Sequence, residues 1–345
     1  MKSKLLIVLL TAVANAFILT AFETADAAEN SLFIYGKITT VDNESYEGQI
    51  RWGKEEALWF DFFNSQKPKN NNLKMLKDEE LEGLSAKDYK QHSKNNNSSW
   101  WKKTWHYYDT DNTHVFACQF GDIKSLKLSR GDKVIVEKKD GDVYVLEGGS
   151  NDIGTTVQIY DRELGNLKMA WDRIEKVEFM STPGSLESAY GYPLYGTVRT
   201  IHGKFTGYVQ WDHDERLSKD ELNGEHADGD MDIEFGNIKS ITKSSRGSKV
   251  VLNSGREFNL VGSNDVNGDN RGIIVNMPGK GRVDIRWEEF DAVEFSKAPS
   301  SSLSYNDFKG EKHIRGSVEL INGNIIEGRI VYDLDEESNL EMLNG

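Results

Sequence analysis

The sequence has little cysteine and little proline: Cys118 is the only cysteine, and there are 5 prolines among 345 residues. No disulfide can form within the chain, so its stability has to come from a hydrophobic core. Apolar residues make up 37% of the chain and aromatic residues 10%, which is enough to build one. The 7 histidines are scattered, without a His-x-His or His-Glu-x-x-His motif. Nothing in the sequence marks an enzyme, and we predict a protein without catalytic residues.

Positive charge is also scarce, because 42 lysines and arginines stand against 56 aspartates and glutamates, for a net charge of −14. Nucleic acids and anionic membranes are bound through basic surfaces. The composition therefore argues against a nucleic-acid partner.

The N-terminus has the pattern of a secretory signal. Lys2 and Lys4 precede the apolar stretch 5–22, and Ala25-Asp26-Ala27 supplies a small-x-small cleavage site. The alternative is an uncleaved anchor, since the stretch approaches a membrane-spanning length. We predict an exported protein, periplasmic or extracellular, whose mature chain has no integral membrane span.

Two long stretches of the chain match each other, and we call each a B unit. Three matched segments follow one another in each copy: Gly121-Asp-Ile-Lys-Ser-Leu and Gly236-Asn-Ile-Lys-Ser-Ile, Gly149-Ser-Asn-Asp and Gly262-Ser-Asn-Asp, and Trp171–Phe179 and Trp287–Phe295. So many identities in the same order indicate a duplication.

A shorter A unit occurs three times, before, between and after the B units. Its copies are Tyr35-Gly-Lys-Ile with Tyr46–Trp52, Tyr195-Gly-Thr-Val with Phe205–Trp211, and Arg315-Gly-Ser-Val with Ile326–Tyr332. The chain order is therefore A-B-A-B-A.

Apolar and polar residues alternate in both units, with Gly, Asn and Asp between the runs, which is typical of short antiparallel strands joined by hairpins. A glycine inside a strand of each A unit (Gly48, Gly207, Gly328) predicts a bulge or a sharp bend. The aromatic residues that end these strands (Trp52, Trp211, Tyr332) are expected in the core. We predict an all-β fold of tandem, duplicated modules, each a small barrel or a curled antiparallel sheet.

The third A unit, Val318-Glu-Leu-Ile-Asn-Gly-Asn-Ile-Ile-Glu-Gly-Arg-Ile-Val-Tyr-Asp-Leu-Asp, resembles the first sequence motif of Sm-like proteins. More broadly it is similar to the second and third strands of SH3-like small barrels. The resemblance is confined to the A units and implies a strongly bent, five-stranded barrel-like module. The RNA-binding role of Sm proteins is not expected in an exported acidic chain.

The first A unit is lengthened by an insertion, 64–113, in which Leu73, Leu76, Leu81 and Leu84 have near-helical spacing. We divide the chain into a signal peptide (1–27), a first A unit with the insertion (28–120), a first B unit (121–192), a second A unit (193–235), a second B unit (236–312) and a third, incomplete A unit (313–345). The incomplete unit would leave a sheet edge open. Either the natural chain is longer, or this unit pairs with another unit or subunit in self-association.

The insertion contains the least ordinary stretch of the sequence, an aromatic and basic cluster: Trp100, Trp101, Lys102, Lys103, Trp105, Tyr107 and Tyr108. On a strand these aromatic residues would occupy both faces, and exposed aromatic patches commonly bind sugar rings or apolar protein surfaces. The other interpretation is a hairpin that buries both faces.

Acidic clusters follow the second strand of two A units: Asp212, Asp214 and Glu215, and Asp333, Asp335 and Glu336. Oxygen ligands at such spacing suit Ca²⁺, and 265–269 is a further candidate, although none follows an EF-hand loop. Solvated acidic turns are the alternative. The repeated Gly-Ser-Asn-Asp is either a ligand loop present twice or a turn needed for the hairpin geometry.

These patterns favour a cell-envelope binding or scaffold protein that presents repeated β modules to an envelope polymer or a protein partner, with no cofactor except possible calcium. The alternatives are a carboxylate-dependent, glycan-processing enzyme and a purely structural assembly protein.

Overall fold

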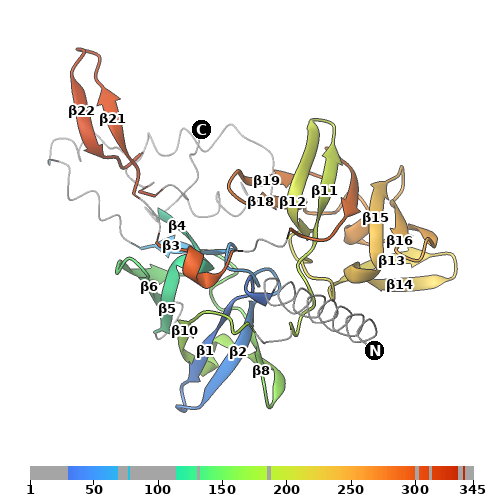
Figure 1. Cartoon of the computed structure of the whole chain (residues 1–345), viewed down its shortest axis with the longest axis horizontal. Coiled ribbons are helices and arrows are strands. Elements are labelled where there is room, and N and C mark those ends of the chain that lie inside the picture. Colours follow the sequence, from blue (N-terminus) through green and yellow to red (C-terminus); the bar gives the residue numbers. More distant parts are fainter. Residues whose placement is uncertain are drawn as a thin grey trace, which may run out of the picture. The chain divides into compact units, whose positions relative to one another are not determined.

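The computed structural model describes residues 30–68, 77, 114–129, 133–184, 188–299, 303–310, 313–332 and 337–338. These residues form antiparallel strands joined by turns and by 3-10 helices of one turn, so the fold is all-β as predicted (Figure 1). The aromatic cluster and the helical pattern of the insertion lie outside the described residues.

The first sheet has eight strands in the order β7-β6-β5-β10-β1-β2-β8-β9. They are β1 (Tyr35–Thr40), β2 (Ser45–Trp52), β5 (Ile123–Leu128), β6 (Lys133–Lys138), β7 (Val143–Glu147), β8 (Val157–Asp161), β9 (Gly165–Met169) and β10 (Ile174–Phe179). All neighbours in this sheet are antiparallel.

The second sheet repeats this order strand for strand, as β17-β16-β15-β20-β11-β12-β18-β19. Its strands are β11 (Tyr195–Thr200), β12 (Gly203–Trp211), β15 (Ile238–Lys243), β16 (Ser248–Leu252), β17 (Glu257–Leu260), β18 (Ile273–Met277), β19 (Gly281–Ile285) and β20 (Phe290–Phe295). The duplication in the sequence is therefore a duplication of structure. We call the two copies the first and the second module.

The A and B units of a module fold together into one sheet. The A strands β1 and β2 pair with each other, and B strands flank them, β10 beside β1 and β8 beside β2. The described chain accordingly divides into two compact units, one around each sheet, and the residues from Leu303 onward group with the first sheet. The bounds that we drew between A and B units remain a sequence-based division.

The sheets are open, so the five-stranded barrel implied by the Sm-like resemblance is not what forms. The B units add hairpins at both ends of each sheet, β6–β7 and β8–β9 in the first and β16–β17 and β18–β19 in the second, so that each sheet has eight strands. The curled-sheet form of the prediction is the one confirmed.

Each module also carries a two-stranded hairpin outside its main sheet. These are β3 (Phe62–Lys67) with β4 (His114–Gln119), and β13 (Glu221–His226) with β14 (Gly229–Glu234). The third A unit forms the hairpin of β21 (Arg315–Glu319) and β22 (Ile325–Arg329).

The core of each module is built around the tryptophan that ends the second A strand. Trp52 and Trp211 are fully buried, and Trp52 packs its ring against Phe63, Phe120 and Trp171 at centroid distances of 5.6–5.9 Å. Cys118 of the first module is also buried. Tyr332 departs from the prediction, because it is 52% exposed in the third A unit.

In the two eight-stranded sheets, Gly48 and Gly207 allow close approach of neighbouring strands and do not form bulges. Gly36 lies opposite Gly48 in an unbroken register, and the register shift between β1 and β10 falls further along, between Thr39 and Thr40. A Cβ atom on Gly48 would lie 1.9 Å from the carbonyl oxygen of Tyr160. Strands β2 and β8 thus approach each other at a point where only glycine fits.

Gly48→Ala should lower the free energy of unfolding by about 1–3 kcal/mol or more, because the added methyl group has to displace backbone. Gly328 has the same place in the third A unit, yet a Cβ there meets nothing within 4 Å. Gly328→Ala is therefore the matched control and should leave stability almost unchanged in urea denaturation. Equal effects of the two substitutions would contradict the close approach.

Candidate functional site

The two acidic clusters predicted from the sequence can be assessed only in part. Residues 333–336, which include Asp333, Asp335 and Glu336, lie outside the described residues, as does the aromatic cluster 100–108. Asp212, Asp214 and Glu215 are described, and they form the candidate site.

A tight turn after β12 positions these carboxylates. Asp212 and His213 both have left-handed backbone, with φ of 47° and 63°, which is uncommon for residues other than glycine. The turn closes when the Trp211 and Glu215 amides each donate to the other residue's carbonyl oxygen, at 2.6 and 3.0 Å. These hydrogen bonds bring Glu215 back beside Trp211, at the end of β12.

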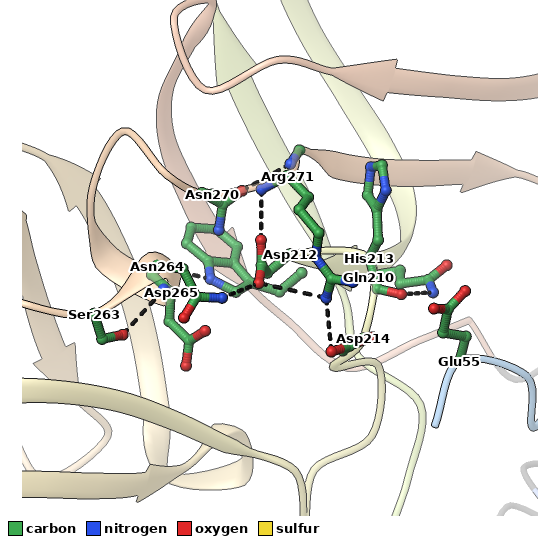
Figure 2. Close-up of polar contacts among 12 residues, drawn as sticks. Glu55, Gln210, Asp212, His213, Asp214, Ser263, Asn264, Asp265, Asn270 and Arg271 are labelled. Atoms are coloured by element: carbon green, nitrogen blue, oxygen red, sulfur yellow. Dashed lines mark hydrogen bonds and ion pairs between the residues drawn. The ribbon is translucent and has the colours of Figure 1, made fainter. Parts of the chain in front are cut away.

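Asp265 of the repeated Gly-Ser-Asn-Asp loop completes the cluster. Carboxylate oxygens of Asp212, Glu215 and Asp265 lie within 4.8 Å of one another, although two of these residues are some fifty positions from the third in the chain. Figure 2 shows Asp212 and Asp265 converging from the β12 turn and from the loop. The structure thus joins two motifs that the sequence presented separately.

Arg271 supplies the positive charge at this site. Its guanidinium lies 2.6 Å from a carboxylate oxygen of Asp214 and 3.4 Å from one of Asp212 (Figure 2). The Arg271 amide and the side-chain amide of Asn264 also donate to Asp212. Asp212 and Asp214 are therefore neutralised from within the protein.

Burial raises the pKa of all three carboxyl groups of the cluster, and at Asp212 the Arg271 amide and guanidinium oppose this effect. Burial raises the pKa of Glu215 to about 9, with further contributions from the charges of Asp265, Asp214 and Asp212. Burial likewise raises the pKa of Asp265 to about 6, against hydrogen bonding from the Asn223 amide. At neutral pH the cluster consequently retains a proton on Glu215.

A calcium ion would find oxygen ligands here, but at a cost. Ca²⁺ binds ionised carboxylates, so Glu215 would have to lose its proton. The ion would also compete with the Arg271 guanidinium for Asp212 and Asp214. Calcium at Asp212, Asp214 and Glu215 remains a hypothesis, and the resident arginine is its main competitor.

The Gly-Ser-Asn-Asp loop makes the same two hydrogen bonds in both modules. The Trp52 indole donates to the Asp152 carbonyl oxygen at 2.9 Å, and the Trp211 indole donates to that of Asp265 at 2.8 Å. The carboxylate of each aspartate accepts the backbone amide of the strand that follows the tryptophan, Asn64 at 2.6 Å and Asn223 at 2.7 Å. These contacts favour the geometric interpretation of the repeat, in which the loop fastens the core tryptophan and a strand.

In the first module, Glu56 and Asp152 form a carboxyl pair like that of Glu215 and Asp265, but no residue there corresponds in chemistry to Asp212. Glu56 corresponds to Glu215, and its carboxyl group is hydrogen-bonded to that of Asp152, whose pKa burial raises to about 7. Gly53, with φ of 60°, takes the place of Asp212. A buried Glu–Asp pair is therefore a feature of the module, whereas the three-carboxylate cluster with Arg271 belongs to the second module.

Sequence reasoning missed Arg271 and the burial of Asp152 and Asp265. Arg271 stands in no recognisable pattern, so nothing pointed to it. The exact repetition of Gly-Ser-Asn-Asp was a usable signal for the aspartates, but it could not show that their side chains face inward.

Comparisons of this chain with protein-family models, with curated proteins and with solved structures found no match. Within the described residues, no helix is both long and apolar enough to cross a membrane.

Glu215→Gln should remove a pH dependence of stability. The pKa of Glu215 in the folded state, about 9, exceeds the ordinary value of 4.5, so the folded state binds more protons than the unfolded state between these values. Its contribution to the free energy of unfolding therefore falls as the pH rises from about 4.5 to 9. We expect the substituted protein to lose less stability than the wild type in thermal melts between pH 5 and 8. Glu221→Gln, at an exposed position of β13, is the control, and parallel curves for all three proteins would contradict the assignment.

Arg271→Ala should make the cluster responsive to calcium. Without the guanidinium, Asp212 and Asp214 lose their compensating charge, and a bound divalent ion would replace it. We expect millimolar calcium to raise the melting temperature of Arg271→Ala more than that of the wild type. Arg286→Ala, which removes an arginine paired with Glu289, controls for net charge. A calcium response in neither protein would argue against a cation site.

Proposed function

We propose that this chain is an exported binding or scaffold protein of the cell envelope, which presents repeated β modules to an envelope polymer or a protein partner. The signal-like N-terminus supports export, and the duplicated modules support presentation of a repeated surface. The proposal rests mainly on the exposed apolar side chains of the third A unit.

The β21–β22 hairpin exposes the side chains that the other two A units bury. Ile38 and Val198 are fully buried, whereas Val318 at the same position is 45% exposed. Trp52 and Trp211 are likewise buried, while their counterpart Tyr332 is exposed. Ile326 on β22 is 59% exposed.

An exposed apolar face of this kind favours contact with a protein. Apolar patches on protein surfaces commonly mark interaction sites. In the complete modules the A hairpin is flanked by β10 and β8, or by β20 and β18, on its two edges. Among the described residues, β21 and β22 pair only with each other as strands. A partner can therefore add a strand to either edge, as in β-augmentation, and self-association of two copies is one form of this.

The rival hypothesis of a glycan-processing enzyme requires two carboxylates aimed at a substrate. Asp152 and Asp265 do have raised pKa values, but each carboxylate accepts a backbone amide of its own module. This arrangement supports a structural role for them. The aromatic cluster 100–108 remains the second expected contact of the binding protein.

Val318→Lys together with Ile326→Lys should abolish capture of the partner, because charged side chains cannot be buried in an apolar contact. The measurement is a pull-down of the mature chain against envelope fractions, with bound proteins and polymers analysed separately. Val145→Lys, at an exposed apolar position of β7, is the matched control and should bind as the wild type does.

A second variant, with Trp100, Trp101 and Trp105 changed to Ala, tests the aromatic cluster in the same pull-down. Loss of binding in this variant alone would move the contact from the hairpin to the insertion. Capture that survives in both variants would contradict the proposal.

A further inference from the structure

The third A unit contains the same internal hydrogen bonds as the A units of the two modules. The Ile330 amide donates to the Ile314 carbonyl oxygen at 2.9 Å, and the matching bond is present in both modules. The Ile314 amide donates to the Glu337 carbonyl oxygen at 3.1 Å, again as its counterparts do. Val318 lies opposite Ile326 across the hairpin. The β21–β22 hairpin is therefore folded as an A unit although, among the described residues, no strand flanks it.

In both modules a glycine on the first A strand makes room for the strand beside it. A Cβ atom on Gly36 would lie 2.4 Å from a carbonyl oxygen of β10, and one on Gly196 would lie 2.5 Å from a carbonyl oxygen of β20. Gly316 has the same place in β21, where a Cβ atom would meet only a methyl group of Ile330 within 4 Å, at 3.2 Å. The third A unit thus has the glycine that a flanking strand requires, and no described residue takes up the room beside it.

The two modules show which kind of strand pairs at this edge. Both β10 and β20 end in Val-Glu-Phe. In β10 the valine lies opposite Ile38 and the phenylalanine opposite Gly36, and β20 has the same register on β11. The counterparts in β21 are Val318 and Gly316. Leu320, where both modules have threonine, adds an apolar side chain opposite the first residue of such a strand. A strand with this pattern would therefore cover the exposed apolar side chains of β21.

The charge of Glu319 on β21 distinguishes between the two strands. Glu319 is exposed and has the place of Thr39, which lies opposite Lys176 of β10. In the second module the matching pair is Arg199 and Ala292. Opposite charges directly across two strands stabilise their pairing, and like charges oppose it. A strand like β10, with a lysine opposite Glu319, therefore fits β21 better than a strand like β20.

We propose that the edge of β21 binds an extended, antiparallel strand of a partner protein with the pattern of β10, in which an aliphatic residue precedes Lys-Val-Glu-Phe by two positions. The valine lies opposite Val318, the lysine pairs with Glu319 and the phenylalanine lies opposite Gly316. A second copy of this chain is not the source of the strand, because its own β10 is paired with β1 and β5. This inference rests on the function proposed for the hairpin and specifies the partner, which binds by β-augmentation.

A labelled peptide of residues 172–181, which contains the sequence of β10, tests the site on the full mature chain by fluorescence anisotropy. We expect saturable binding of one peptide per chain. Gly316→Ala should abolish it, because the added methyl group takes up the room for the backbone of the docked strand. Gly328→Ala, on the other strand of the hairpin, is the matched control and should bind as the wild type does. Circular dichroism melts check that both variants are folded.

A charge exchange tests the register of the docked strand. A peptide with Lys176→Glu should bind the wild-type chain about fivefold more weakly, because like charges then face each other. The chain variant Glu319→Lys should restore its binding and weaken that of the original peptide.

Three results would overturn the proposal: no binding of the peptide to the intact chain, binding that persists in Gly316→Ala, and a dimer in size-exclusion chromatography that the peptide does not dissociate. In the last case the hairpin edges of two copies cover each other. The envelope pull-down separates this inference from the proposed function. Capture that is lost with Val318→Lys and Ile326→Lys, in a chain that does not bind the peptide, would leave the hairpin as a contact and exclude this strand as its ligand. Peptide binding that follows the expected pattern without any captured partner would support the strand site and contradict the envelope function.

Discussion

Each module depends on one hydrogen-bonded connection, between the indole of its core tryptophan and the loop that carries a buried aspartate. The tryptophan fills the space where the sheet bends, and its N–H requires an acceptor once it is buried. The Asp152 and Asp265 carbonyl oxygens provide that acceptor, and the carboxylates of the same residues hold the next strand by its amide. Loop, core and outer hairpin are therefore connected through a single residue in each copy.

This connection explains the unusual ionisation of the buried carboxyl groups. A carboxylate removed from water is costly unless it is paired, so the group retains a proton or acquires a donor. The first module meets this requirement with the Glu56–Asp152 pair. The second module has a third carboxylate, Asp212, and the Arg271 guanidinium pairs with it. Two carboxylates of the predicted metal site, Asp212 and Asp214, are thus paired with an arginine of the chain itself.

The duplicated modules use their shared framework for different surfaces. Tyr305 stacks on Trp59 at the end of the first sheet, whereas the second module has Ser218 at the place of Trp59 and a cavity lined in part by Phe235 and Phe295. The third A unit keeps the hairpin register, with Gly316 opposite Gly328, and exposes its apolar side chains. The copies therefore share their core and differ in the residues that cover it.

The sequence by itself determined the all-β class, the duplication and the burial of Trp52 and Trp211, because alternation of apolar residues and repeated motifs are local properties. It also marked the Gly-Ser-Asn-Asp loop and the acidic turn, although as separate features. Only the tertiary structure decided that A and B strands share one open sheet, since strand order depends on pairings between distant segments. It alone brought Asp265 and Arg271 to Asp212 and placed Tyr305 on Trp59. Contacts between such distant residues leave no periodic trace in a single sequence, because they depend on how the strands are arranged in space.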